Sequence, residues 1–171
     1  MRKRNRVVIS GMGVLAPNGT GLEEFWNSLL NGRSGVGPIF DASGFRSRIA
    51  GEVKGFAPFD YIEPELKPRR MARHTQLAYA ATMMALADAH LDLDNLELPS
   101  PTPVIIGVST SSLDVIERIF QDVNDNNPNK VSPSALSASQ PQASANLIAD
   151  RLGACEMRPR FRPRVRPAST P

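Results

Sequence analysis

Apolar positions follow two periodicities along the chain, one typical of strands and one typical of helices. Residues 6–14 form a β-rich apolar run, which predicts a buried first strand rather than a secretion signal. Thr20 and Glu23 then have the spacing of a capping box at a helix start. Five apolar positions on one face extend this helix to Gly32: Leu22, Phe25, Trp26, Leu29 and Leu30.

The middle of the chain predicts a loop-rich excursion, a helix and a second strand. Residues 33–62 are rich in Gly, Pro and Asp, with a short hairpin expected around residues 48–53. The continuous apolar run at 103–109 predicts a strand covered on both faces. Between them, alanine-rich residues 70–90 predict a buried helix with inward positions at Leu77, Ala80, Ala81, Met84 and Ala87.

Two more helices are expected towards the end of the chain. A cap at Ser111 or Ser112 precedes the third helix. The fourth spans about residues 139–152, with Pro141 in its first turn and Gly153 just past its end. Strands that alternate with helices predict an α/β fold with a mostly parallel sheet. The inward positions of the third helix are Leu113, Ile116, Ile119 or Phe120, and Val123.

Length and composition bound the class of protein. The 171 residues are enough for one domain or part of one, and no apolar stretch approaches the roughly 18 residues that a membrane-spanning helix needs. A lone cysteine, Cys155, excludes an intramolecular disulfide and suits a reducing compartment. We therefore expect a soluble, cytoplasmic protein without a membrane partner.

The positive charge is concentrated at the end of the chain. Residues 155–171 contain five arginines and one acid, whereas residues 1–154 hold 15 bases and 16 acids. Arg alternates there with Pro and other residues, so the segment predicts no packed core. One alternative function is a polyanion-binding module acting through this tail. Phe161 is its only aromatic residue, which gives base stacking and a nucleic-acid partner little support.

Gly11 and Gly13 suggest a second alternative, a nicotinamide-binding oxidoreductase. They follow the predicted first strand and match part of the dinucleotide-binding pattern. The match is weak, because the next helix starts only after residues 17–21 and no acidic residue ends a second strand at the required distance. A tight turn after the first strand is favoured. His74 and His90 are expected to be ordinary helix residues, so we expect neither a cofactor nor a metal.

Several ordered stretches together resemble one enzyme family. They resemble the N-terminal part of elongating β-ketoacyl-[acyl carrier protein] synthases of the synthase II type, and the likeness extends from residue 5 to about residue 154. This is more specific than any single motif. The stretches are residues 7–19, Phe25-Trp26, residues 30–35, 40–45, 50–56 and 69–76.

The resemblance implies a fold and an activity. The fold is the thiolase-like layered αβαβα architecture, of which residues 1–154 would supply most of the first half, and relatives form homodimers. The reaction is decarboxylative condensation of an acyl thioester with malonyl-[acyl carrier protein], in fatty-acid or polyketide synthesis, without a cofactor. The nucleophilic cysteine and two histidines of the family lie beyond the matching residues, so no catalytic residue is assigned and Cys155 is not the nucleophile.

The tail at 155–171 departs from the family pattern just before the cysteine motif is due. Read in a shifted frame, codons 162–168 are compatible with Thr-Ala-Cys-Ala-Thr-Gly at the expected distance. A frameshift is therefore the hypothesis for the tail. We expect the chain to be an inactive, truncated and poorly soluble fragment, because its apolar elements lack covering layers.

Two surfaces are assigned from the resemblance. Lys67, Arg69 and Arg70 occupy the region where relatives dock the acidic carrier protein, although cations at a helix start are also compatible with a merely solvated surface. Val108 and Thr110 match the segment near the acyl pocket and dimer interface, with Thr110 in place of an apolar gating residue. That difference leaves the preferred acyl-chain length open.

Overall fold

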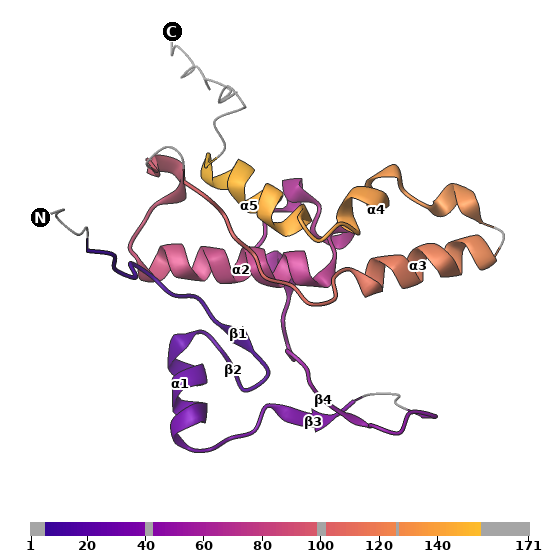
Figure 1. Cartoon of the computed structure of the whole chain (residues 1–171), viewed down its shortest axis with the longest axis horizontal. Coiled ribbons are helices and arrows are strands. Elements are labelled where there is room, and N and C mark those ends of the chain that lie inside the picture. The colour runs from indigo at the N-terminus through magenta and orange to yellow at the C-terminus, as the bar shows by residue number, and fades with distance from the viewer. Residues whose placement is uncertain (1–5, 40–42, 99–101, 126, 155–171) are drawn as a thin grey trace, which may run out of the picture.

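Helices and two small hairpins make up the described chain (Figure 1). The computed structural model describes residues 6–39, 43–98, 102–125 and 127–154. The α-helices are α1 (Leu22–Leu30), α2 (Arg73–Asp88), α3 (Leu113–Asn124), α4 (Pro133–Ala138) and α5 (Ala143–Leu152). The strands are β1 (Leu15–Ala16), β2 (Gly19–Thr20), β3 (Val36–Pro38) and β4 (Ile49–Gly51). Short 3-10 turns are η1 (Pro58–Asp60), η2 (Pro64–Leu66), η3 (Pro68–Arg70), η4 (Leu93–Asn95) and η5 (Pro128–Lys130).

The core lies where α2 packs against α5 (Figure 1). Ile62, Tyr79 and Ile148 are its buried members, each 2% exposed or less. The first precedes η2, the second lies in α2 and the third in α5. Burial of large side chains from three separate segments stabilises their arrangement. Partly buried apolar residues surround them, among them Leu66, Met71, Val104, Ile106 and Leu147.

The predicted parallel sheet is not formed within the described residues. Residues 6–14 include no strand, and Val7 is 94% exposed. Residues 103–109 include none either: Val104 and Ile106 pack on the core while Ile105 is 87% exposed. The prediction of two strands was wrong here because a strand requires a hydrogen-bonded neighbour, and these runs find none in the described part. The second run is covered on one face, not on two.

The strands that do form are antiparallel. β1 pairs with β2, and β3 pairs with β4 in the register Val36↔Gly51 and Pro38↔Ile49. The second pair confirms a hairpin near residues 48–53, although its other strand lies further upstream than the sequence suggested. These hairpins lie with α1 on one side of the helical layer (Figure 1).

Helix α1 begins one residue later than the predicted capping box implies, whereas its end is as expected. Gly21 is the cap, and the carboxylate of Glu24, not of Glu23, accepts a hydrogen bond from the backbone N–H of Thr20 at 2.8 Å. Because the helix starts one residue later than expected, the third helical position falls on Glu24. Gly32 has a φ of 62°, which confirms the left-handed ending.

Helix α2 is shorter than predicted at its start. It begins at Arg73, because residues 68–70 form the separate turn η3. Ala80 is buried as expected from the alanine pattern, whereas Ala87 is exposed. The alanine-rich helix is therefore buried over only part of its length.

Helix α3 buries a different face from the one predicted. Val115 is its buried residue, and Ile116 and Ile119 are partly covered. Leu113 and Phe120 are 61% and 64% exposed, and Val123 is also exposed. The sequence pattern identified the helix, and α4 and η5 are among the elements that pack against it.

The predicted fourth helix is two helices, α4 and α5. The side chain of Ser132 accepts a hydrogen bond from the N–H of Ser134, and Pro133 occupies the first position of α4. Pro141 falls between the helices rather than in the first turn of one. Gly153 ends α5 with a φ of 65°, as predicted.

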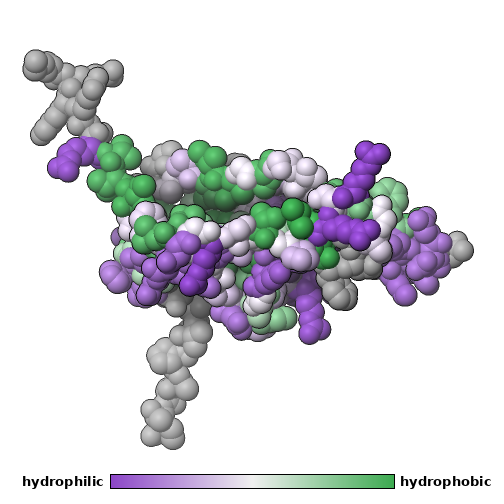
Figure 2. Space-filling view, turned by 90° about the horizontal axis from the view of Figure 1, so that it is seen from below, coloured by the Kyte–Doolittle hydropathy of each residue, from purple (hydrophilic) through white to green (hydrophobic). Residues whose placement is uncertain are grey.

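Large apolar side chains remain on the surface of the described chain. The inward face predicted for α1 is largely exposed, with Trp26 at 59% and Leu30 at 67%. Figure 2 shows hydrophobic groups lying at the surface beside hydrophilic ones. Among the described residues, no helix has both the length and the apolar composition to cross a membrane.

Candidate functional site: a basic segment beside a pocket

Two consecutive 3-10 turns ahead of α2 position the cations: Lys67 lies between the turns, and Arg69 and Arg70 lie in the second. Pro64 opens η2 and Pro68 opens η3, since the fixed φ of proline suits the first position of a helical turn. Lys67 joins the turns in the left-handed conformation, with a φ of 55°. We call residues 67–70 the basic segment. The sequence suggested that it starts α2, but in the structure it precedes the helix and includes the separate turn η3.

The cations of the basic segment are exposed and unneutralised. Among the described residues, no carboxylate oxygen lies within 4.0 Å of the charged nitrogens of Lys67, Arg69 or Arg70. The Arg69 guanidinium lies over the Phe59 ring, 5.6 Å from its centroid. The segment therefore presents positive charge that an anionic partner can pair with.

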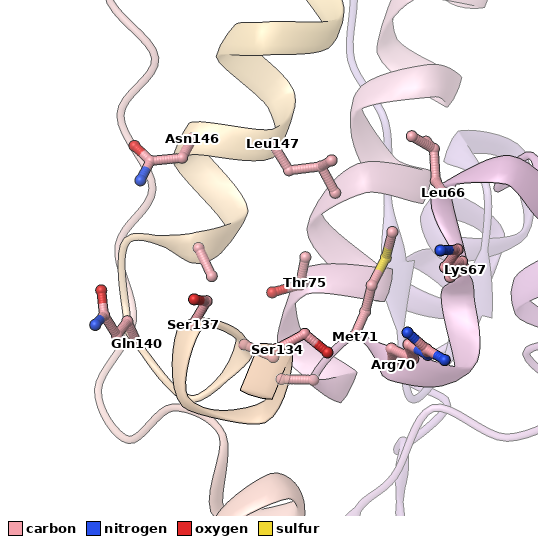
Figure 3. Close-up of a pocket in the computed structure, with 13 residues that line it drawn as sticks. Leu66, Lys67, Arg70, Met71, Thr75, Ser134, Ser137, Gln140, Asn146 and Leu147 are labelled. Carbon is pink, nitrogen blue, oxygen red and sulfur yellow. The ribbon is translucent and has the colours of Figure 1, made fainter. Parts of the chain in front are cut away.

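A pocket of about 530 Å³ adjoins the basic segment (Figure 3). Leu66, Met71 and Leu147 supply apolar lining, and Lys67 and Arg70 lie on the side formed by the basic segment. Polar residues of α4, α5 and the turn between them line the opposite side: Ser134, Ser137, Gln140 and Asn146. The pocket thus combines apolar surface, neutral hydrogen-bonding groups and positive charge.

Hydrogen bonds among three side chains from distant segments hold the chain just before the basic segment. The hydroxyl of buried Tyr79 donates to Oε2 of Glu63 at 2.8 Å, and Nη2 of Arg151 donates to Oε1 of Glu63 at 2.5 Å. Nε of Arg151 donates to the Tyr79 hydroxyl at 3.3 Å. We call this the Glu63–Tyr79–Arg151 clasp. It joins the residue before η2 to both α2 and α5.

The clasp shifts the ionisation of all three groups. Burial, followed by the hydrogen bond with Glu63, raises the pKa of Tyr79 to about 12. Burial alone would raise the pKa of Glu63, but hydrogen bonds from its backbone, Tyr79 and Arg151 outweigh it and lower that pKa. Burial would likewise lower the pKa of Arg151, and the hydrogen bonds with Tyr79 and Glu63 raise it instead. The ion pair is thus favoured at neutral pH.

Arg73 connects the start of α2 to neighbouring segments. Its backbone N–H donates to Oδ2 of Asp114 at 3.0 Å, and its guanidinium donates to the carbonyl of Val53 at 3.3 Å. The guanidinium also lies 4.6 Å from the centroid of the Phe56 ring. Arg73 is therefore a structural cation, unlike the three of the basic segment.

Gly11 and Gly13 lie against α2 and form no nucleotide-binding turn. A Cβ on Gly13 would overlap the carbonyl oxygen of Ala81, and one on Gly11 would overlap that of Ala85. The β1–β2 hairpin follows them, and α1 begins only at Leu22. The expectation of a tight turn was wrong; these glycines permit close approach of two backbones.

The remaining candidates are separate from the pocket. Val108 is 38% exposed and Thr110 is exposed, both in the stretch that leads to α3. His74 lies in α2, where burial lowers its pKa while Asp114 opposes the shift, whereas His90 follows the helix with a φ of 55°. No cluster of three potential metal ligands occurs among the described residues. Cys155 lies outside the described residues.

Sequence reasoning found the basic segment but missed the clasp and the far wall of the pocket. Glu63 and Arg151 are 88 positions apart, so no local spacing signals their pairing. The Ser132-Pro133 pair was a usable signal for α4, since it combines a cap residue with a first-position proline.

Comparison with known proteins identifies the family. Residues 4–155 match the family described as Beta-ketoacyl synthase, N-terminal domain. The chain belongs to this family.

Individual relatives agree with this assignment. The 3-oxoacyl-[acyl-carrier-protein] synthase 2 of Vibrio cholerae is 38% identical over 154 residues, which are 89% of this chain and 36% of that protein. A protein of Streptomyces violaceoruber named as a granaticin polyketide β-ketoacyl synthase is 46% identical over 125 residues, 70% of this chain and 28% of its own length. The chain thus spans just over a third of the first relative and less than a third of the second.

Solved structures show the same fold. The ishigamide ketosynthase/chain length factor superposes with a TM-score of 0.74 at 33% identity, covering 88% of this chain and 38% of that one. A β-ketoacyl synthase from Burkholderia phymatum gives a TM-score of 0.70 at 28% identity, covering 87% and 37%. The expected α/β, thiolase-like class is therefore confirmed, and the described residues trace its N-terminal part.

Proposed function

We propose that this chain provides the carrier-protein docking surface of a β-ketoacyl-[acyl carrier protein] synthase. The observation that carries the proposal is the basic segment: three exposed cations without carboxylate partners among the described residues, held beside a pocket by the clasp. An acidic carrier protein has the complementary charge. The relatives named as 3-oxoacyl-[acyl-carrier-protein] synthases support this choice of partner.

The reaction that the intact enzyme performs is a decarboxylative condensation. An acyl group passes from its carrier thioester to an enzyme thiolate, and the carrier thiol leaves. Malonyl-[acyl carrier protein] then loses carbon dioxide, its carbanion attacks the acyl thioester to form a carbon–carbon bond, and the enzyme thiolate leaves. None of the described residues of this chain is assigned to these steps. Its role in the proposal is to bind and orient the carrier.

Further parts of the proposal concern assembly and location. Val108 and Thr110 contribute to the acyl pocket and to the interface of a homodimer, and the enzyme acts in the cytoplasm. The exposed apolar residues of adjoining α3, including Leu113 and Phe120, favour an interface there. The proposal includes no cofactor and no metal.

The boundary of the domain is placed after residue 154. Residues 1–154 form the N-terminal part of the synthase domain, and 155–171 are a frameshifted tail without the catalytic cysteine. Sequencing the gene from codon 145 to several hundred bases past codon 171 tests this boundary. A shifted frame that encodes the cysteine motif and later histidines would support the proposal, and a frame lacking them would overturn it.

The docking proposal is tested by measuring how the chain binds an acidic acyl carrier protein. Substitution of Lys67, Arg69 and Arg70 by Glu is expected to weaken binding roughly tenfold or more, because three favourable charge pairs become repulsive. Fluorescence anisotropy of a labelled carrier at two salt concentrations provides the measurement. Arg46→Glu and Arg48→Glu, in exposed positions near β4, form the matched control and should change binding little. Equal loss in both variants would contradict the proposal.

A further inference from the structure

A polar pocket lies among the two hairpins and α1, which share one side of the helical layer (Figure 1). Its volume is about 370 Å³, within the usual range of small-molecule sites. The β1–β2 hairpin, α1, the loop after α1 and the segment after β4 line it, and no residue of the basic segment does. We call it the hairpin pocket. Its polar lining includes Asn18, Glu24, Ser28, Arg33, Ser34 and Lys54.

The segments that line the hairpin pocket are packed against one another. A Cβ on Gly35 would lie 2.8 Å from the carbonyl carbon of Pro17, and one on Gly51 would lie 3.1 Å from Cγ of Pro17. The turn of the β1–β2 hairpin therefore touches both strands' surroundings in the second hairpin. The backbone N–H of Arg33 donates to the carbonyl of Ser28 at 2.8 Å, which fixes the loop after α1. A site that is already shaped loses less entropy when a ligand binds.

The lining of the hairpin pocket carries two cations and one carboxylate. Arg33 and Lys54 are exposed, and in the described ranges no carboxylate oxygen lies within 4.0 Å of their charged nitrogens. Oε2 of Glu24 accepts the backbone N–H of Thr20 at 2.8 Å. Because a carboxylate has about four lone-pair sites, Glu24 can accept further hydrogen bonds. The pocket thus offers two unneutralised cations beside a hydrogen-bond acceptor.

Ser28 adds a buried polar group to this lining. The residue is 4% exposed and lines the pocket from α1. Within the described part of the chain, its hydroxyl has no hydrogen-bond partner, although its backbone carbonyl has one. A buried hydroxyl without a partner is unfavourable. A polar ligand that supplies this partner therefore gains affinity.

These groups together fit a small carboxylate that also carries a hydroxyl group. The guanidinium of Arg33 can hold a carboxylate with two parallel hydrogen bonds, and Lys54 adds a second positive charge. A neighbouring hydroxyl on the ligand can donate to Glu24 and accept from Ser28. An ammonium group at that place would be repelled by the two cations, so a hydroxy acid is favoured over an amino acid.

We propose that the hairpin pocket binds a small hydroxy acid, with its carboxylate on Arg33 and Lys54 and its hydroxyl on Glu24 and Ser28. The proposal uses no residue of the basic segment. It depends neither on carrier-protein docking nor on the condensing reaction. It assigns a role to polar groups that the proposed function leaves unused.

Titration of glycerate into the isotopically labelled full chain tests the proposal, with propionate, the same carbon chain without hydroxyls, as the comparison. Backbone amide resonances of Asn18 and Ser34 should shift saturably with glycerate. Propionate should bind roughly tenfold more weakly or less, because it cannot donate to Glu24. Sodium chloride at matched ionic strength should cause no saturable shift. Observation at these amides separates the pocket from the basic segment and from the arginines of residues 155–171.

Variants of the lining test the assigned contacts. Arg33→Gln with Lys54→Gln should weaken glycerate binding roughly tenfold or more, because the carboxylate loses both cations. Ser28→Ala should reduce the preference for glycerate over propionate several-fold. Arg46→Gln with Arg48→Gln, at exposed positions that do not line the pocket, is the matched control and should bind glycerate normally.

A variant of the basic segment keeps the two proposals apart. Lys67→Glu should weaken carrier binding and leave the glycerate response unchanged, since Lys67 does not line the hairpin pocket. Failure of carrier docking and failure of the hairpin pocket are therefore distinguishable. Absence of saturation at Asn18 and Ser34, equal binding of propionate, or equal loss in the control pair would overturn the proposal.

Discussion

The α2 backbone lies so close to residue 13 that only glycine fits there without overlap. A methyl group at this position would overlap the Ala81 carbonyl of α2. Gly13→Ala should therefore lower the free energy of unfolding by about 1–3 kcal/mol, the usual cost of overpacking. Urea unfolding followed by circular dichroism measures the change.

Gly107 provides the matched control for this substitution. A Cβ built on it meets no atom within 4 Å, and its φ is not in the left-handed region. Gly107→Ala should be nearly neutral. If both variants unfold alike, the contact with α2 is not what requires glycine.

The clasp makes stability depend on alkaline pH. The pKa of Tyr79 is raised from 10.0 to about 12 in the folded chain, so its neutral form is favoured by folding. Its contribution is complete below pH 10 and is lost as the pH rises towards 12. Unfolding midpoints should fall more steeply over that window in the unmodified chain than in Tyr79→Phe.

Absorbance of tyrosinate gives an independent measurement of the same shift. The chain has two tyrosines, Tyr61 and Tyr79. Tyr79→Phe should remove the component that titrates near pH 12. Persistence of that component in the variant would contradict the assignment.

At the scale of elements, the helices were largely predictable, whereas the hairpin near residues 48–53 was the one strand pair that the sequence indicated among the described residues. The apolar spacing of α1 and α3 and the glycines that follow α1 and α5 lie close together in sequence, so local patterns identify them. A strand at residues 6–14 or 103–109 depends on a neighbour that local patterns do not supply. The basic segment was found because its charges are contiguous, whereas Glu63 and Arg151 meet only through the fold.

The start of α4 depends on a single cap. Ser132 accepts the N–H of Ser134 and also contacts its hydroxyl. Ser132→Ala should destabilise the chain by about 1 kcal/mol, since a helix-end donor loses its partner. Thermal unfolding measures this. Ser137→Ala, also in α4 but with no cap role, should shift the midpoint less, and an equal shift would contradict the role of the cap.

At the scale of the whole molecule, the described chain leaves much apolar surface uncovered. Trp26 on α1 and Phe120 on α3 are 59% and 64% exposed. Because large exposed apolar groups favour association, the chain alone is expected to self-associate. Sedimentation velocity should show species larger than the monomer at micromolar concentration, and a cooperatively melting monomer would contradict this expectation.

A paired substitution tests whether exposed apolar surface drives association. Trp26→Lys with Phe120→Lys should shift the sedimentation profile towards the monomer, since both changes add charge to exposed apolar faces. Glu117→Lys, at an exposed position on α3, is the charge control. An equal shift in that variant would attribute the effect to net charge rather than to apolar surface.

The clasp also sets an order of events during synthesis of the protein. Glu63 leaves the ribosome 88 residues before Arg151, which at usual elongation rates is roughly 4 to 18 s. Until Arg151 is translated, Glu63 and Tyr79 lack their cationic partner. Glu63, which precedes the turns of the basic segment, is therefore joined to α5 only after that helix has been translated. A nascent chain thus exposes the cations of the basic segment before the clasp is complete.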